Sequence, residues 1–394
     1  MRGLSLGDRV LWRRVKDYVA KYQPFLIGVA GVSQVELTRH AIRSALGEDR
    51  AVVAPRQQRS GHRSVAKGVL GVAETENLSW WQLLGRSLVT ETLEKEPDTI
   101  IVSLYPHRPG QVDWLIQQLP FQMVVATDVQ SVHLDYFHDL TTVAHELMSA
   151  AVALPAEALL VLNNDDPFVS EMASKAAAQQ FSYSASGQAE VMAERFDRRP
   201  RGGFAGEVRV HAKSLELHLP QLVGRWQLHA MLAGLQVAHL LGTDLTAAAR
   251  RLQNLVVPSR HLVKRQGQRQ ATIYDHTAAV APEVMLADLA TLRALSSQGS
   301  DHQRTIAVIN ELPGLAGMSD RWHRRLGQQA GQTAQIVVGI GRQARALVAE
   351  AIEGGADAHH FDTAAEAGKW LPESVQRDDA VLLAGGGAAV SDVL

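Results

Sequence analysis

The sequence predicts an α/β protein with a larger central domain and a smaller C-terminal domain, each built around a mainly parallel sheet. Along most of the chain, short apolar runs alternate with segments that have the 3.6-residue spacing of helices. The apolar runs are hydrophobic on both faces, as strands are when helices cover both sides of a parallel sheet. The chain has 394 residues, too many for one compact core. These observations together favour two α/β domains.

The first half of the chain repeats a strand–turn–helix unit. Residues 1–22 predict a basic amphipathic helix that ends before Pro24. Residues 25–32 (FLIGVAGV) then predict a buried strand that runs into a glycine turn, and residues 35–46 have helical spacing. Further units follow, with strands at 99–105, 121–129 and 158–167 and helices at 112–119 and 140–154.

The pattern changes between Gln188 and Leu219. A basic, glycine-rich loop precedes residues 207–219, which alternate like exposed antiparallel strands, and 224–242 predicts a long helix. We place a domain boundary at Val257-Pro258. Beyond it, four strands with helices between them are expected at 271–276, 305–312, 334–341 and 380–387. The expected organisation is an N-terminal helix at 1–24, a central domain at 25–256 and a C-terminal domain at 257–394.

The composition excludes several function classes. The formal net charge is -2, so no global basic field exists to hold nucleic acid or an anionic membrane. The absence of cysteine excludes disulfides, thiolate metal sites and a cysteine nucleophile. There is no signal-peptide pattern and no apolar run of about 18 residues, so we expect a cytoplasmic protein without membrane insertion.

The turn after the first strand, residues 28–38 (GVAGVSQVELT), lies where an α/β fold binds phosphate. Backbone N–H groups and the positive end of the helix dipole point to this place. A working phosphate loop also needs a lysine for the phosphates and a Ser or Thr hydroxyl for magnesium. Val35 and Glu36 stand at those two positions, and Glu36 would repel a triphosphate. The segment fits an ordinary strand-to-helix turn as well.

Seven segments follow one another at a characteristic spacing. Four of them are PDTIIVSLYPHRPGQVDWL, VVATDVQSVHLDYFHDLTTVA, LLVLNNDDP and GRWQLHAMLAGLQVAHLLGTDL, and three more are VPSRHLV, IYDHTAA and SDRWHRRLG. In this order they resemble the Mur ligase family, most closely the type that adds D-alanyl-D-alanine to the UDP-muramoyl tripeptide. The resemblance runs from about Leu26 to Leu394, and a helix stands where the family has a UDP-sugar domain.

The resemblance implies a P-loop-like central domain, a Rossmann-like C-terminal domain and a set of site residues. It assigns nucleotide contacts to Gly31, Ser33, Asn163, Asp165, Arg260 and Asp275. It assigns a metal to His133 and Asp135, and substrate contacts to Arg108 and His323. ATP and magnesium are the cofactors that it implies for an active member.

The departures from the family pattern concern the residues that handle ATP. The G-K-T/S positions of the phosphate loop read Gln34, Val35 and Glu36, and the magnesium-binding glutamate becomes Ser103. The family's second lysine aligns with Leu147. Further replacements are Trp226 for histidine, Ala230 for the asparagine that faces adenine, and Ala384 with Gly385–Gly387 for K-G-S-R. Phosphoryl transfer needs cations over the phosphates, so these losses remove most of the charge neutralisation.

Three functions therefore compete. The leading hypothesis is a catalytically impaired or inactive Mur ligase homologue that binds another cell-wall biosynthesis protein or a UDP-muramoyl peptide. The second is a divergent active ligase that takes its cations from Arg108, Arg260 or a basic loop. The third is an oxidoreductase, because Gly339, Gly341 and Ala344 fit a dinucleotide turn and Asp362 lies about 20 residues on. The segment HLDYFHD (133–139) also fits either a metal site or a polar loop.

Overall fold

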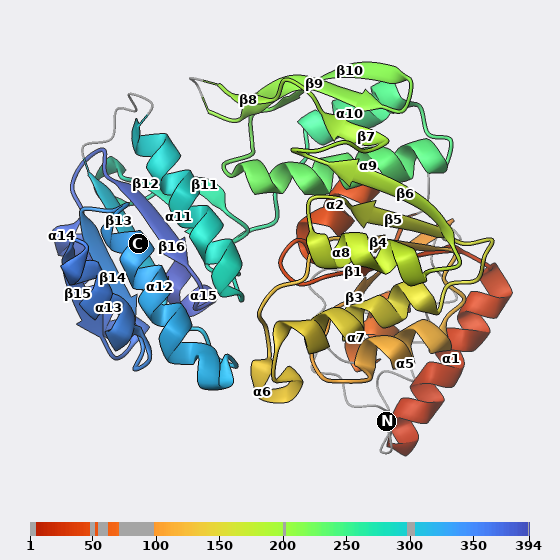
Figure 1. The fold of residues 1–394 in the computed structure, drawn as a ribbon, viewed down its shortest axis with the longest axis horizontal. Helices are drawn as coiled ribbons and strands as arrows, with labels where there is room; N and C mark the ends of the chain where they lie inside the picture. Colours follow the sequence, from red (N-terminus) through yellow and green to blue (C-terminus); the bar gives the residue numbers. More distant parts are fainter. Residues whose placement is uncertain are drawn as a thin grey trace.

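The computed structural model describes residues 5–47, 52–53, 62–70, 98–199, 202–297, 304–392 and 394. Two sheets, each covered by helices, form two bodies that lie side by side, with the N-terminal helix at the far edge of the larger body (Figure 1). The predicted α/β class with mainly parallel sheets is confirmed. No helix within the described ranges is long and apolar enough to cross a membrane.

The larger sheet has the strand order β10-β9-β7-β6-β5-β4-β1-β3-β2, with β8 paired to β9. All pairs from β2 across to β7 are parallel, whereas β8, β9 and β10 are antiparallel additions, as the alternating pattern of 207–219 predicted. The strands are β1 Phe25–Ala30, β2 Val52–Val53, β3 Thr99–Leu104, β4 Met123–Ala126, β5 Leu159–Asn163, β6 Gln179–Ser184, β7 Val191–Ala193, β8 Asp197–Arg198, β9 Phe204–Val210 and β10 Lys213–Leu219.

Helices bury both faces of the central strands β1, β3 and β4, which explains why these strands are mainly apolar. On β1, Ile27 and Val29 point into one core cluster and Leu26 and Ala30 into the other. The first cluster includes the helices α2 Val35–Leu46, α9 Leu228–Leu240 and α10 Leu245–Gln253. The second includes α1 Leu6–Tyr22, α3 His62–Val69, α5 Gln111–Gln118, α6 Leu134–Phe137, α7 Leu140–Val152 and α8 Pro167–Met172.

The smaller sheet has the order β11-β12-β16-β13-β14-β15, and only the β11–β12 pair is antiparallel. Its strands are β11 Val263–Gln266, β12 Thr272–His276, β13 Thr305–Asn310, β14 Ile336–Ile340, β15 Asp357–Phe361 and β16 Ala380–Ala384. The four predicted strands are the four central ones, and the two edge strands are additions. The helices are α11 Pro282–Ser297, α12 Ser319–Gly331, α13 Ala344–Glu353, α14 Ala364–Ser374 and α15 Ala388–Ser391.

Short 3-10 helices connect several of these elements, at η2 Ala173–Lys175, η3 Arg225–Gln227, η4 Gln268–Gln270 and η5 Ala316–Met318. Between α10 and β11 the chain passes from one sheet to the other. The boundary at Val257-Pro258 remains our proposal for where the two domains divide.

Candidate functional site

The candidate site lies at the carboxyl ends of β1 and β4. In the larger sheet β1 lies between β3 and β4. Strands β2 and β3 are added on one side of β1, and β4 and β5 are added on its other side. Such a switch leaves a crevice beyond the strand ends, and open α/β sheets bind ligands there. The loop Gly31–Gln34, which joins β1 to α2, lies at this crevice.

The carboxylate of Asp128, just beyond β4, fills this loop. It accepts hydrogen bonds from the backbone N–H groups of Val32 (3.2 Å), Ser33 (2.8 Å) and Gln34 (3.2 Å). The Thr127 hydroxyl donates a fourth hydrogen bond at 2.7 Å. Converging N–H groups at a helix N-terminus are the donors that a phosphate would use. The loop is therefore satisfied by an anion that belongs to the chain itself.

The two loop residues to which the sequence assigned nucleotide contacts serve this internal arrangement. Gly31 permits the close approach, because a Cβ there would overlap the Thr127 hydroxyl oxygen and lie 2.8 Å from Asp128 Oδ1. Ser33 donates its hydroxyl to Gln130 at 2.5 Å. This geometry tests neither assignment. It does show that Gly31 packs against Thr127 and Asp128 and that the Ser33 hydroxyl already has a partner.

A buried arginine connects two of the altered family positions. Arg39 is 1% exposed, and its Nη1 donates to Glu36 Oε2 at 2.8 Å and to Ser103 Oγ at 3.0 Å. His40 contacts the other oxygen of Glu36 at 3.1 Å. Burial alone would raise the pKa of Glu36, but the hydrogen bond with His40 and the charge of Arg39 outweigh it and lower the pKa to about 2. This network places a buried ion pair at two positions where the family pattern has magnesium ligands.

The position of the second family lysine is apolar and enclosed. Leu147 in α7 is 1% exposed and belongs to the core. Its neighbour Glu146 accepts backbone hydrogen bonds from Gly110 (2.8 Å) and Val112 (2.6 Å), so it caps α5. Neither side chain supplies a cation to the crevice.

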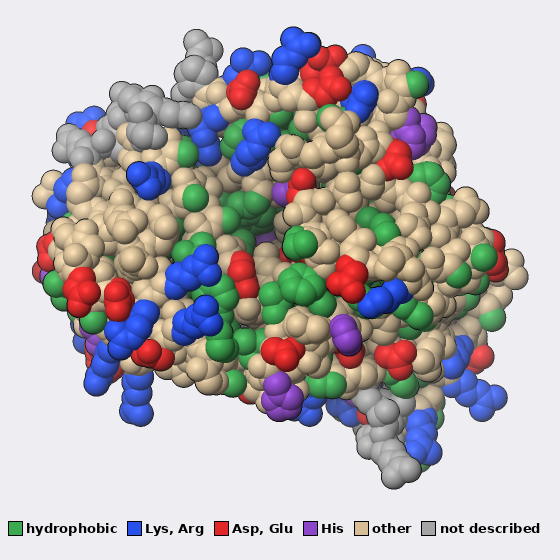
Figure 2. Space-filling model, in the orientation of Figure 1, with side chains coloured by type: hydrophobic (Ala, Val, Ile, Leu, Met, Phe, Trp, Pro, Cys, Tyr) green, Lys and Arg blue, Asp and Glu red, His purple; other side chains and the backbone are tan. Residues whose placement is uncertain are grey.

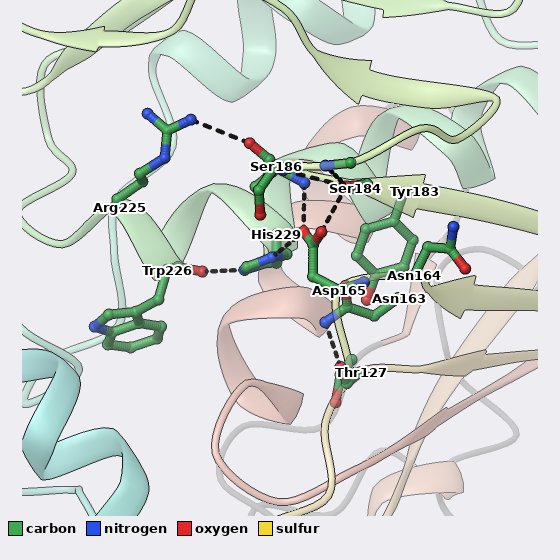
Figure 3. Close-up of polar contacts among 12 residues, drawn as sticks. Thr127, Asn163, Asn164, Asp165, Tyr183, Ser184, Ser186, Arg225, Trp226 and His229 are labelled. Carbon is green, nitrogen blue, oxygen red and sulfur yellow. Dashed lines mark hydrogen bonds and ion pairs between the residues drawn. The ribbon is translucent and has the colours of Figure 1, made fainter. Parts of the chain in front are cut away.

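The polar side chains at the end of β5 and just after it form hydrogen bonds within the chain (Figure 3). Asn163 donates to the Thr127 carbonyl at 2.7 Å. Asp165 accepts hydrogen bonds from Ser184 Oγ and the Ala185 N–H, each at 2.6 Å, and lies 2.8 Å from His229 Nε2. Burial works to raise the pKa of Asp165, but these hydrogen bonds, led by that of His229, hold it well below its usual value. Asp165 is thus an ionised structural acceptor in this arrangement.

Three rings lie together beyond β3. His107 lies between Tyr105 and His133, with ring centroids 4.3 Å and 5.2 Å away. Burial, with His133 adding to the effect, lowers the pKa of His107 to about 3. Burial also lowers the pKa of His133, against the opposing charge of Asp135. Both imidazoles are therefore neutral at neutral pH.

The polar side chains of segment 133–139 do not converge on one position where a metal ion could bind. Asp135 is exposed, and Asp139 caps α7 by accepting the Thr142 N–H at 2.7 Å. In the described part of the chain, no group of three or more His, Asp or Glu side chains lies close enough to hold a metal ion. His133 and Asp135 offer at most a partial ligand set.

The two candidate arginines lie on different bodies. Arg108 is exposed, and its guanidinium lies 5.1 Å from the ring centroid of Tyr136. Arg260 has a left-handed backbone (φ 64°), and its Nη1 lies 3.9 Å from the Cβ position of Gly387. Neither arginine has a carboxylate partner among the described residues. Each is therefore available to meet an anionic ligand.

The C-terminal candidates Asp275 and His323 are buried and form hydrogen bonds with neighbouring residues. Asp275 is 2% exposed and accepts from Thr277 Oγ1 (2.8 Å) and Ser391 Oγ (2.6 Å). His323 is fully buried: Nε2 accepts the Leu312 N–H at 3.2 Å and Nδ1 contacts the Ser319 carbonyl at 2.8 Å. The imidazole has no nitrogen left for a substrate, so this geometry is that of a structural histidine.

The glycine turn after β14 contains its own carboxylate as well. Glu311 Oε2 accepts the Gln343 N–H at 2.8 Å, and a Cβ at Gly341 would overlap the same carboxyl group. Asp362, which would meet a ribose, lies 3.2 Å from Arg345. A dinucleotide pyrophosphate needs the N–H groups at this turn, so the geometry does not favour the oxidoreductase hypothesis.

Helix α11 connects the two bodies through two carboxylates. Glu283 accepts from Ser131 Oγ at 2.5 Å. Asp288 accepts from Trp226 Nε1 at 3.2 Å and lies 2.6 Å from His276 Nδ1, while the Trp226 ring stacks on His276 with centroids 5.2 Å apart. Figure 2 shows the hollow between the bodies, with hydrophobic and histidine side chains in its depth. Trp226, which stands where the family pattern has a histidine, contacts side chains of the C-terminal body.

Comparison with known proteins identifies relatives in one group. The family model described as "Mur ligase middle domain" matches residues 59–238. UDP-N-acetylmuramoyl-tripeptide--D-alanyl-D-alanine ligase of Mycobacterium tuberculosis is 26% identical over 270 residues, covering 67% of this chain and 52% of the relative. The Mycobacterium leprae protein of the same name is 25% identical over 294 residues, covering 67% and 55%. The chain spans about half the length of these curated relatives.

Solved structures show the same fold. MurF from Acinetobacter baumannii superposes with a TM-score of 0.80 at 18% identity, covering 97% of this chain and 78% of that one. MurF ligase from Thermotoga maritima in complex with ADP gives a TM-score of 0.77 at 17% identity, covering 98% and 83%.

Sequence reasoning missed the two side chains that organise the crevice. In the segment VVATDVQSVHLDYFHDLTTVA, Asp128 stands where the family pattern T-N-I-x-x-x-H-L-D-x-F has asparagine. This added negative charge beside a phosphate loop was a signal that the sequence carried. Arg39 carried no such signal, because one arginine in a helix gives no indication that it is buried against β3.

Proposed function

Because the chain belongs to the Mur ligase family, we propose that it acts as a binding member of that family in peptidoglycan-precursor metabolism and does not activate a substrate with ATP. The observation that supports this most directly is the Asp128 carboxylate within the loop Gly31–Gln34. Its ligand is a UDP-muramoyl peptide or another cell-wall biosynthesis protein. A cytoplasmic location is part of the proposal.

Electrostatics argue against a triphosphate in the crevice. A phosphate would have to displace Asp128 from three N–H groups and would then lie beside two carboxylates, those of Asp128 and Glu36. Two like charges 4 Å apart repel by about 4 kcal/mol at an effective dielectric constant of 20. Arg39 is committed to Glu36, while Val35 and Leu147 carry no charge. The residues present therefore do not fit ATP with magnesium, and we derive no phosphoryl-transfer step.

Calorimetric titration of the full chain with Mg-ATP tests the proposal. We expect no heat and no rise in melting temperature up to millimolar nucleotide. MurF ligase from Thermotoga maritima has been solved in complex with ADP. That protein therefore serves as the positive control for nucleotide binding. A dissociation constant tighter than about 100 μM, roughly −5.5 kcal/mol by the usual conversion, would overturn the proposal.

A divergent active ligase is the second candidate, favoured by Arg108 and Arg260, which have no carboxylate partner among the described residues. Arg108 and Arg260 could supply positive charge from opposite bodies. This function predicts phosphate release from ATP in the presence of a muramoyl peptide and an amine. Loss of that release in both Arg108→Ala and Arg260→Ala, with Arg321→Ala unchanged, would establish it in place of the first.

A further inference from the structure

The outer face of α1 has an unusual charge pattern. The helix packs inward through Leu11, Trp12, Val15 and Val19. Its exposed side chains include five cations and one anion, namely Arg9, Arg13, Arg14, Lys16, Lys21 and Asp17. The chain as a whole has a formal charge of -2, so this helix is more basic than the chain average. Figure 2 shows Lys and Arg side chains at the lower right, where Figure 1 places α1.

Four of these five cations, namely Arg9, Arg13, Arg14 and Lys16, form no ion pair with any described residue, whereas Lys21 lies over the Tyr22 ring. Arg9 and Arg13 are four residues apart, and Arg13 and Lys16 three, so their side chains are neighbours on the helix surface. Like charges at these spacings destabilise a helix. An external anion would convert this repulsion into attraction.

An apolar side chain accompanies the cations. Leu6 is 77% exposed. Steps of three, four and three residues lead from Leu6 to Arg9, Arg13 and Lys16, so all four lie along one side of the helix. We call this line, from Leu6 to Lys16, the basic face. The helix has 17 residues, which at 1.5 Å each extends it about 25 Å.

We propose that the basic face binds an anionic membrane surface. A straight, convex row of cations with one exposed leucine at its end matches a planar, fluid layer of acidic headgroups, into which the leucine can dip. A stable protein interface would instead bury about 800 Å² per partner around an apolar centre, whereas Leu6 is the exposed apolar side chain of this row. The net charge of the chain does not oppose this, because charges beyond about 8–10 Å are screened at physiological ionic strength. The contact is peripheral and needs no membrane-spanning helix.

Vesicle sedimentation of the full chain tests the proposal. Wild type should sediment with vesicles of 30% phosphatidylglycerol in phosphatidylcholine but not with pure phosphatidylcholine, and 0.5 M salt should release it. Each basic residue at an anionic surface improves binding about five-fold. The variant Arg9→Gln/Arg13→Gln/Lys16→Gln should therefore bind about 100-fold more weakly.

A matched control carries the same change of charge elsewhere. Arg321→Gln/Arg325→Gln/Arg342→Gln replaces three exposed arginines of the C-terminal body and should bind vesicles like wild type. Equal losses in both triple variants would show a non-specific charge effect and overturn the proposal. Absence of wild-type binding at 50 mM salt would also overturn it, and so would retention on duplex DNA or an acidic protein without vesicle binding. Unchanged melting temperatures establish that the variants are folded.

Discussion

Replacing Asp128 with asparagine tests the central feature of the candidate site. The carboxylate accepts three backbone N–H groups and one hydroxyl, all within the buried crevice. A hydrogen bond to a charged group contributes about 1.5–3 kcal/mol and a neutral one about 0.5–1.5 kcal/mol, so losing the charge costs about 1 kcal/mol per N–H bond. We therefore expect Asp128→Asn to lower the free energy of unfolding by about 3 kcal/mol.

Urea unfolding followed by circular dichroism measures this loss. Asp139→Asn is the matched control, because Asp139 caps α7 at an exposed position where asparagine caps equally well. Phosphate should also raise the melting temperature of Asp128→Asn more than that of wild type, since the loop N–H groups lose their internal anion. A stability change within about 0.5 kcal/mol of the control would refute the reasoning, because the carboxylate would then contribute little to the loop.

Three further changes have defined outcomes. Gln236 is fully buried, and neither of its amide atoms has a partner among the described residues. Gln236→Leu should therefore raise the free energy of unfolding by about 1–2 kcal/mol, measured from the urea midpoint. A lower midpoint would indicate that a buried water satisfies the amide. Asp288→Ala removes the acceptor shared by Trp226 and His276, so it should cost about 3 kcal/mol and shift tryptophan emission to the red, and unchanged emission would contradict a connecting role. The lowered pKa of Glu36 stabilises the fold above its unfolded value of 4.5, and this contribution disappears as pH falls towards 2; Glu36→Gln should flatten the stability curve in that window, which acid titration of the urea midpoint would reveal.

The sequence predicted the interior of each sheet better than its edges. Central strands such as Ile336–Ile340 are apolar on both faces, so hydrophobic runs identify them directly. The edge strand Asp357–Phe361 has one strand neighbour and exposed or half-buried side chains, and its sequence DAHHF contains no apolar run. Gln179–Ser184 was missed for a related reason, because polar side chains occupy most of a strand that pairs on both sides. Hydrophobicity reports burial, and these strands are held mainly by backbone pairing.

At the candidate site, the sequence predicted the loop between β1 and α2 but not the side chains that contact it. The strand–turn–helix pattern placed the loop after β1 correctly, because that signal is local. The partner of the loop comes from β4, about 95 residues away along the chain, and only the folded sheet shows that Asp128 points into it. The same holds for Arg39, whose contact with Ser103 spans 64 residues. Single-sequence patterns carry no information on such pairings.

If the chain does not bind ATP, as we propose, the internal carboxylate also makes the stability of this fold independent of the nucleotide concentration. A protein whose phosphate loop is completed by a bound ligand gains stability with ligand concentration, about 2.7 kcal/mol at a hundred-fold excess over the dissociation constant. Asp128 is covalently part of the chain, so its local concentration at the loop Gly31–Gln34 is constant. The folded fraction, and with it the resistance to proteolysis, would stay the same when cellular ATP falls.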